Sequence, residues 1–193
     1  MNSIWLTGPS ALGKSTFIKK FCEQNKEIQP YKEITRSNLS ILNTPFATRQ
    51  LFFGLNYVNR HRSSITKSFI SDRTILDYIF WTIYDSKITE FDNTIIFANF
   101  MPIIEDYFDD SDIFIVIKPP ESYEDFKRLI FPNYLSDPLR HSIYISKYND
   151  IYGYPPYTHD DLCNFVFHMS LDMYTNINNS LSTLKKMGKI KTF

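Results

Sequence analysis

Glycine is scarce in this sequence, with 5 in 193 residues, and cysteine is scarcer still, with 2. Cys22 and Cys163 lie far apart and form no CxxC pair, so we expect neither a disulfide framework nor a zinc site. An excess of one charge is also missing, because 21 Lys and Arg residues balance 21 Asp and Glu residues. This balance argues against a broadly basic surface, so duplex nucleic acid is not an expected partner.

Long apolar stretches are absent too. No run of about 18 apolar residues occurs, and the first residues lack the basic and apolar regions of a secretory signal. We therefore expect no membrane partner and a cytoplasmic, reducing location. The many Asn, Ile, Lys and Tyr residues are typical of an AT-rich genome and leave a viral source open.

The composition that remains is typical of one globular domain. Hydrophobic residues make up 43% and charged residues 22% of the chain, which favours a packed core over disorder. A length of 193 residues fits a single domain over residues 1–193.

Short apolar runs alternate with helical patterns along the chain. We predict strands over residues 4–7, 29–34, 68–71, 113–117 and 189–193. We predict helices over residues 14–23, 45–62, 74–84, 93–108, 121–130, 139–151 and 159–187. This alternation favours the α/β class, with a parallel sheet covered by helices on both faces.

Residues 8–15 match the phosphate-binding pattern GxxxxGK[ST]. The pattern follows a predicted strand and opens a predicted helix, which is the context that makes it credible. Backbone amides between Gly8 and Gly13 can surround a phosphate, Lys14 can reach the β- and γ-phosphates, and Ser15 can bind Mg²⁺. The candidate nucleotide-binding residues are Gly8, Pro9, Ser10, Ala11, Leu12, Gly13, Lys14, Ser15 and Thr16.

Asp72 and Arg73 follow the third predicted strand. The carboxyl ends of parallel strands face the ligand crevice, so Asp72 is expected near the phosphate loop, where a carboxylate can hold Mg²⁺ or take a proton. Arg73 can bridge phosphates with its planar guanidinium. The alternative is that Asp72 caps the helix that begins near Thr74.

Three segments together resemble the P-loop kinases of small molecules: GPSALGKST at residues 8–16, ISDRTILDY at residues 70–78, and a region that contains Arg128 and Arg140. The resemblance is to thymidylate kinases and deoxynucleoside kinases, and also to NadR-type nicotinamide ribonucleoside kinases and phage AAA-type kinases. It implies a P-loop NTPase three-layer fold, with a five-stranded parallel sheet in the order 2-3-1-4-5 and a helical lid, here about residues 128–158. Nucleoside monophosphate kinases usually have a third glycine in the loop, where Ala11 or Leu12 stands here.

The resemblance also implies roles for individual residues. Glu33 lies where deoxynucleoside kinases have a general base, and Asp72 is the other candidate for that role. The candidate catalytic residues are Lys14, Glu33, Asp72, Arg73, Arg128 and Arg140. The candidate acceptor-binding residues are Arg36, Phe53 and Arg60, and the candidate metal ligands are Ser15 and Asp72.

An enzyme that moves the γ-phosphoryl group of ATP to a nucleoside or nucleotide is the function that the resemblance implies, with Mg²⁺ as the metal and a deoxynucleoside monophosphate as the favoured acceptor. A 5′-hydroxyl polynucleotide end and nicotinamide riboside are alternative acceptors. A nucleotide-dependent switch or ATPase is the alternative from another class. A homodimer is left open.

Overall fold

The computed structural model describes residues 3–31, 56, 59–60, 67–84, 108, 111–135 and 137–191. The strands in these ranges are β1 (Ile4–Thr7), β2 (Gln29–Tyr31), β3 (Phe69–Asp72) and β4 (Ile113–Val116). The helices are α1 (Lys14–Gln24), α3 (Ile75–Ile83), α5 (Tyr123–Asp125), the π-helical turn η3 (Phe126–Ile130), α6 (Phe131–Leu135), α7 (Pro138–Tyr152) and α8 (His159–Lys186). The predicted helix over residues 93–108 lies outside the described residues except at its last position, and of the one over residues 45–62 only Asn56, Asn59 and Arg60 are described, all helical.

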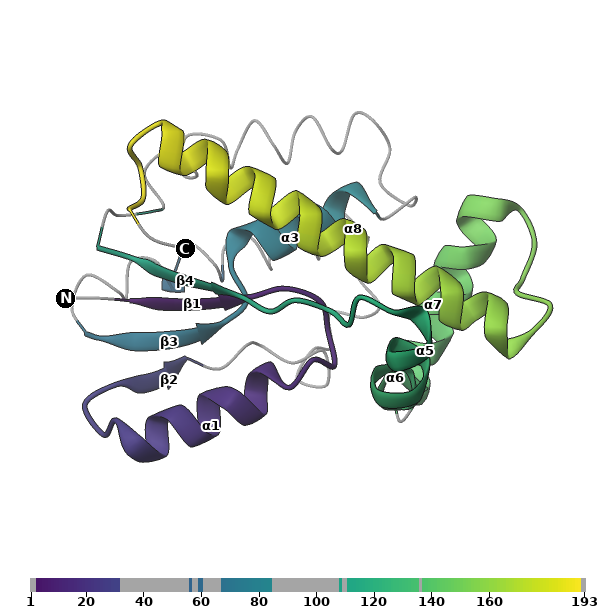
Figure 1. Ribbon diagram of the computed structural model, residues 1–193, viewed down its shortest axis with the longest axis horizontal. Coiled ribbons are helices and arrows are strands. Elements are labelled where there is room, and N and C mark those ends of the chain that lie inside the picture. Colours follow the sequence, from purple (N-terminus) through teal and green to yellow (C-terminus); the bar gives the residue numbers. More distant parts are fainter. Residues whose placement is uncertain are drawn as a thin grey trace.

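The strands form one parallel sheet in the order β2-β3-β1-β4. This confirms the first four positions of the predicted order 2-3-1-4-5. Ile4 of β1 lies opposite Ile70 of β3 on one side and Ile113 of β4 on the other. Figure 1 shows the four strands pointing toward the end of the molecule where α5, α6 and α7 lie, so the carboxyl ends of the strands face these helices.

Two hydrophobic clusters place helices on opposite faces of the sheet. Trp5 is fully buried and contacts Phe69 edge to face, with ring centroids 5.2 Å apart, in the larger cluster, which includes side chains of α3 and α8. Leu6, the next residue of β1, points to the other face and packs with Ile18 of α1. Figure 1 accordingly shows α1 on one side of the sheet and α3 and α8 on the other, which confirms the three-layer α/β architecture.

The helical region after β4 is interrupted by the π-helical turn η3. The backbone N–H of Phe131 bonds to the carbonyl of Phe126, five residues back. Pro132 follows directly, and a proline both lacks an N–H and clashes with the carbonyl four residues before it in a regular α-helix. A wider π turn relieves that conflict, so the single helix predicted over residues 121–130 becomes a short α-helical turn and a π turn, and α6 continues beyond its predicted end.

Both ends of α8 are capped. Thr158 accepts a hydrogen bond from the backbone of Asp161, whose side chain accepts one from the backbone of Thr158. At the other end the backbone N–H groups of Gly188 and Lys189 bond to the carbonyls of Lys185 and Leu184, with Gly188 at φ 73°. These caps explain why residues 189–191 do not continue into the predicted fifth strand; residues 192 and 193 lie outside the described ranges.

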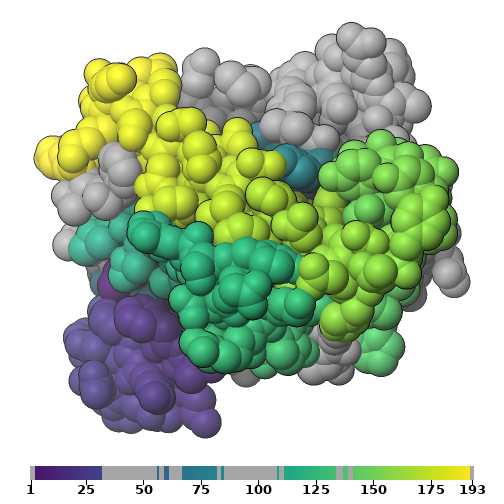
Figure 2. Space-filling view, turned by 45° about the vertical axis from the view of Figure 1, so that its right-hand side comes forward, coloured from purple at the N-terminus to yellow at the C-terminus, as the bar shows by residue number. Residues whose placement is uncertain are grey.

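Figure 2 shows the segment from α5 to α6 at the surface, between α1 on one side and α7 and α8 on the other. Within the described ranges, no helix is both long enough and apolar enough to cross a membrane.

Candidate functional site

The loop between β1 and α1 has three residues with positive φ angles: Gly8 at 120°, Ala11 at 61° and Gly13 at 78°. Gly8 lies so close to β4 that a Cβ atom on it would be 2.7 Å from the carbonyl oxygen of Ile117. Ala11, one of the two residues that stand where nucleoside monophosphate kinases usually have a third glycine, adopts the left-handed conformation that favours glycine. The loop therefore has the tight backbone that the motif predicts.

Lys14 points back into this loop. Its ammonium group is buried and donates hydrogen bonds to the carbonyl oxygens of Gly8, at 2.8 Å, and Pro9, at 2.5 Å. A buried ammonium group needs hydrogen-bond acceptors, and these two carbonyl oxygens supply them. An ammonium group held in this position can bind phosphate oxygens in the same way.

Ser15 and Asp72 meet at the mouth of the loop. The Ser15 hydroxyl donates a hydrogen bond of 2.8 Å to Oδ2 of Asp72. The other carboxylate oxygen, Oδ1, is buried and has no hydrogen-bond partner within the part of the chain that the structure describes. A hydroxyl and a carboxylate are suitable magnesium ligands, and the described residues contain no cluster of three or more His, Cys, Asp or Glu that would form a complete cage. The pair fits a magnesium ion that takes its remaining ligands from nucleotide phosphates and water.

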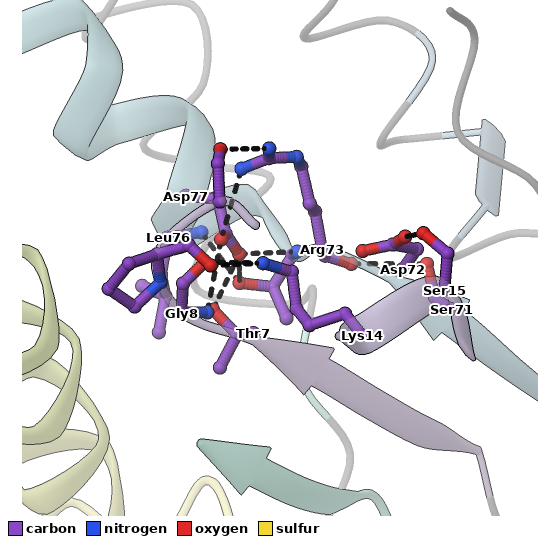
Figure 3. Close-up of polar contacts among 12 residues, drawn as sticks. Thr7, Gly8, Lys14, Ser15, Ser71, Asp72, Arg73, Leu76 and Asp77 are labelled. Atoms are coloured by element: carbon purple, nitrogen blue, oxygen red, sulfur yellow. Dashed lines mark hydrogen bonds and ion pairs between the residues drawn. The ribbon is translucent and has the colours of Figure 1, made fainter. Parts of the chain in front are cut away.

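Arg73 crosses the loop from the end of β3. One of its terminal nitrogens donates to Oγ of Ser10 at 2.8 Å, and the other lies 3.7 Å from Oδ1 of Asp77. The φ angle of Arg73 is 79°, and its backbone N–H bonds to the carbonyl of Leu6 at 2.7 Å. Figure 3 shows its side chain reaching toward Asp77, near Lys14. The guanidinium is thus held beside the loop that would contain the phosphates.

Asp77 was not identified from the sequence, although it contacts the end of β1, the first residue of the loop and the residue before α3. It is fully buried, and its Oδ2 accepts hydrogen bonds from the Thr7 hydroxyl at 2.5 Å and from the backbone and hydroxyl of Thr74 at 2.7 and 3.0 Å. Its Oδ1 accepts from the Gly8 N–H at 3.3 Å. The spacing Thr74-x-x-Asp77 is the sequence signal that could have found it, because it resembles a helix capping box.

The start of α3 is capped by Thr74 rather than by Asp72. The Thr74 hydroxyl accepts a hydrogen bond of 3.1 Å from the backbone N–H of Leu76. The alternative hypothesis, that Asp72 caps this helix, is therefore wrong, because the Asp72 carboxylate accepts a hydrogen bond from Ser15 instead.

Arg60, expected to bind the acceptor, is fully buried below the end of β3. One guanidinium nitrogen donates to the Ser71 hydroxyl at 2.9 Å and to the backbone carbonyl of Asp72 at 2.7 Å. The guanidinium also lies 5.2 Å from the ring centre of Tyr31. In this arrangement Arg60 supports the backbone that carries Asp72.

The two arginines of the predicted lid, Arg128 and Arg140, have no described contact with the phosphate loop. Arg128 is exposed on η3 and donates to the Asp125 carboxylate at 2.8 Å. Arg140 lies in α7, and its side chain is outside what the structure describes. The remaining candidates, Glu33, Arg36 and Phe53, also lie outside the described residues. Among the other loop residues, Thr16 is exposed, Pro9 is buried and Leu12 is partly buried.

The segment after β4 is tied to the amino-terminal end of α8. Lys127 of η3 donates to the Asp160 carboxylate, and the Tyr123 hydroxyl donates to the Asp160 backbone carbonyl at 3.3 Å. The hydrogen bond between the two charged groups raises the pKa of Lys127 and lowers the pKa of Asp160. These contacts connect the start of the predicted lid to a long, doubly capped helix.

No protein-family model and no curated protein sequence matches this chain. Among solved structures, the chain is similar to deoxyadenosine kinase from M. mycoides with bound dATP, with a TM-score of 0.58 and 12% sequence identity over 99% of this chain and 90% of that chain. A second structure of deoxyadenosine kinase from M. mycoides, with the products dCMP and a flexible dCDP bound, matches with a TM-score of 0.48 and 19% identity over 95% and 99% of the two chains. The first likeness shows that the chain has the fold of a deoxynucleoside kinase, as expected from the sequence.

Proposed function

We propose that this protein transfers the γ-phosphoryl group of ATP to a nucleoside or nucleotide, and that a deoxynucleoside is the acceptor class. The observation that carries the proposal is the hydrogen bond of 2.8 Å between Ser15 and Asp72 at the mouth of a loop that already encloses the Lys14 ammonium. This arrangement suits a magnesium–triphosphate ligand. The shared fold with a deoxyadenosine kinase over 99% of the chain favours a deoxynucleoside over its monophosphate as the acceptor.

The phosphate loop would hold the triphosphate before any bond changes. Its backbone amides and the amino-terminal end of α1 favour negative charge. Lys14 would exchange the carbonyl oxygens of Gly8 and Pro9 for phosphate oxygens when the nucleotide binds. In-line positioning of this kind supplies much of the rate of a phosphoryl transfer.

Ser15 and Asp72 would hold the metal, and magnesium bound there supplies positive charge that neutralises the phosphate oxygens. The acceptor hydroxyl oxygen would bond to the γ-phosphorus as the bond from that phosphorus to the β–γ bridging oxygen breaks, and ADP leaves. The hydroxyl proton would pass to a carboxylate, for which Glu33 and Asp72 are the two candidates. Arg73, held beside the loop at Ser10, would stabilise the charge on the transferred group.

The segment after β4 would act as a lid over residues 128–158. A lid that excludes water prevents hydrolysis of ATP in place of transfer. In this role Arg128 would exchange its surface partner Asp125 for the phosphates, and Arg140 would approach from the start of α7.

A transfer panel with γ-labelled ATP tests the function. The acceptors are the four deoxynucleosides, their monophosphates, nicotinamide riboside and a 5′-hydroxyl oligonucleotide. We expect label on at least one deoxynucleoside, little ATP hydrolysis without an acceptor, and a loss of about 1000-fold or more in Lys14→Ala, which removes the charge inside the loop. Lys19→Ala is the matched control, because Lys19 is exposed on the same helix, and it should transfer like the wild type.

Two outcomes would contradict the proposal. Rapid ATP hydrolysis that no acceptor changes would indicate a switch or ATPase. Transfer to the oligonucleotide alone would indicate a polynucleotide kinase.

A further inference from the structure

Asp77 has no role in the proposed chemistry, yet its buried carboxylate has two sides with different neighbours. Oδ2 bonds to the Thr7 hydroxyl and to the backbone and hydroxyl of Thr74, and so joins the end of β1 to the start of α3. Oδ1 faces the Gly8 N–H at 3.3 Å and the Arg73 guanidinium at 3.7 Å. The first side links two elements of the fold, and the second side faces the phosphate loop.

The position of Arg73 depends on contacts at both ends of its guanidinium. Asp77 attracts one terminal nitrogen, and the Ser10 hydroxyl accepts a hydrogen bond from the other. The backbone of Arg73 has a positive φ of 79° and is fixed by hydrogen bonds to Leu6 and from the Ser71 hydroxyl. An arginine in this conformation is strained, and such strain persists where the surroundings fix it.

We propose that Asp77 is a positioning residue that holds Arg73 over the phosphate loop and so presents its guanidinium to the triphosphate of ATP. In this role Asp77 touches neither nucleotide nor acceptor and acts through Arg73. A carboxylate in this place keeps a long, flexible side chain in one orientation before the ligand arrives, which lowers the entropy cost of binding. The inference rests on the proposed function for the identity of the nucleotide.

The variant Asp77→Asn changes the contacts of Oδ1 and keeps those of Oδ2. The amide oxygen can take the place of Oδ2 and keep the hydrogen bonds from Thr7 and Thr74. The amide NH₂ then stands where Oδ1 was and faces two other donors, the Gly8 N–H and the Arg73 guanidinium. The variant therefore releases Arg73 while it retains the link between β1 and α3.

The test is a double-mutant cycle on ATP affinity, measured by calorimetry with millimolar magnesium in the wild type, Asp77→Asn, Arg73→Ala and the double variant. We expect each single variant to bind ATP about tenfold more weakly, as for the loss of one charge-assisted contact. The double variant should bind no more weakly than Arg73→Ala, because Asp77 acts through Arg73. The inference would be overturned if Asp77→Asn bound ATP as tightly as the wild type. It would also be overturned if the loss of affinity in the double variant equalled the product of the losses in the two single variants.

Thr74→Val is the control for a structural effect, since it removes the hydrogen bond to the other carboxylate oxygen and the cap on the Leu76 N–H. It should lower the melting temperature and leave ATP affinity as in the wild type. If Asp77→Asn does not fold, Asp77→Glu replaces it, because the longer side chain displaces Arg73 and should give the same non-additive loss.

The cycle also separates this inference from the proposed function. A wild type that binds ATP but transfers to no acceptor removes the proposed function, and the cycle still decides the role of Asp77. A wild type that transfers, with losses that multiply in the cycle, removes only the inference. A wild type that does not bind ATP contradicts both.

Discussion

The Ser15 hydroxyl bonds to the Asp72 carboxylate at 2.8 Å, although the two residues are 57 positions apart in sequence. The sheet brings them together. β1 and β3 are parallel neighbours with Leu6 opposite Asp72, so the loop that follows β1 and the carboxylate that ends β3 open at the same edge. The order of the strands in the sheet therefore brings the two residues of the candidate metal site together.

Replacing this carboxylate should change the response to magnesium. In Asp72→Asn we expect the transfer rate at saturating ATP to fall about 100-fold or more, because a ligand of the charge-neutralising metal is lost. The magnesium concentration for half-maximal rate should rise as well. Initial rates across a magnesium titration measure both, with Asp150→Asn, an exposed carboxylate on α7, as the control. An unchanged magnesium midpoint would speak against metal binding by Asp72.

Gly8 should tolerate no side chain. In Gly8→Ala a Cβ atom would lie 2.7 Å from the Ile117 carbonyl oxygen at a φ of 120°, so we expect a loss of about 2–4 kcal/mol in the free energy of unfolding. Gly153 has a φ of 79° and open space around it, so Gly153→Ala should cost about 1 kcal/mol. Urea unfolding of both variants measures the difference, and equal losses would contradict the close approach of Gly8 to β4.

Replacing Ala11 with glycine should stabilise the protein. Its φ of 61° places it in the left-handed region, where an alanine is strained by about 1–2 kcal/mol. Part of the gain is offset because glycine makes the unfolded chain more flexible. We expect Ala11→Gly to raise the free energy of unfolding by about 0.5 kcal/mol. A destabilised Ala11→Gly in thermal or urea unfolding would show that the loop is not strained at this residue.

The sequence predicts the positions of those parts of the candidate site that depend on a contiguous motif or on strand order. The loop over residues 8–15 is contiguous, and the rule that parallel strands end at one edge placed Asp72 beside it. Asp77 was missed because two of its partners, Thr7 and Gly8, are 70 and 69 positions away, while its local spacing to Thr74 suggests no more than a helix cap.

Other differences between the prediction and the structure come from the burial of a charged side chain and from hydrogen bonds that compete with strand formation. Arginine is usually exposed, so sequence alone could not place Arg60 in full burial beneath Ser71 and Asp72. The predicted fifth strand failed to form over residues 189–191 because the Lys189 N–H caps α8. Ile190 is nevertheless buried and belongs to the larger hydrophobic cluster.

The two cysteines should react slowly and unequally. Burial raises the pKa of both thiols, and Cys163 is the more deeply buried. A raised pKa leaves less thiolate at neutral pH, so iodoacetamide at pH 7 should label Cys22 more slowly than a free thiol and Cys163 only after unfolding. The Cys22 rate should still be rising above about pH 8.5, the usual thiol pKa. Mass spectrometry of timed samples measures this, and rapid labelling of Cys163 in the folded protein would contradict its burial.

The central position of β1 has a consequence for synthesis on the ribosome. Ile4 pairs with Ile113 as well as Ile70, so the strand that precedes the phosphate loop is translated long before its second neighbour. At about 5–20 residues per second, that delay is on the order of 5–20 seconds. During this delay Trp5 can meet Phe69 but not Phe114 or the side chains of α8, so part of its apolar surface stays exposed on the nascent chain until β4 and α8 emerge.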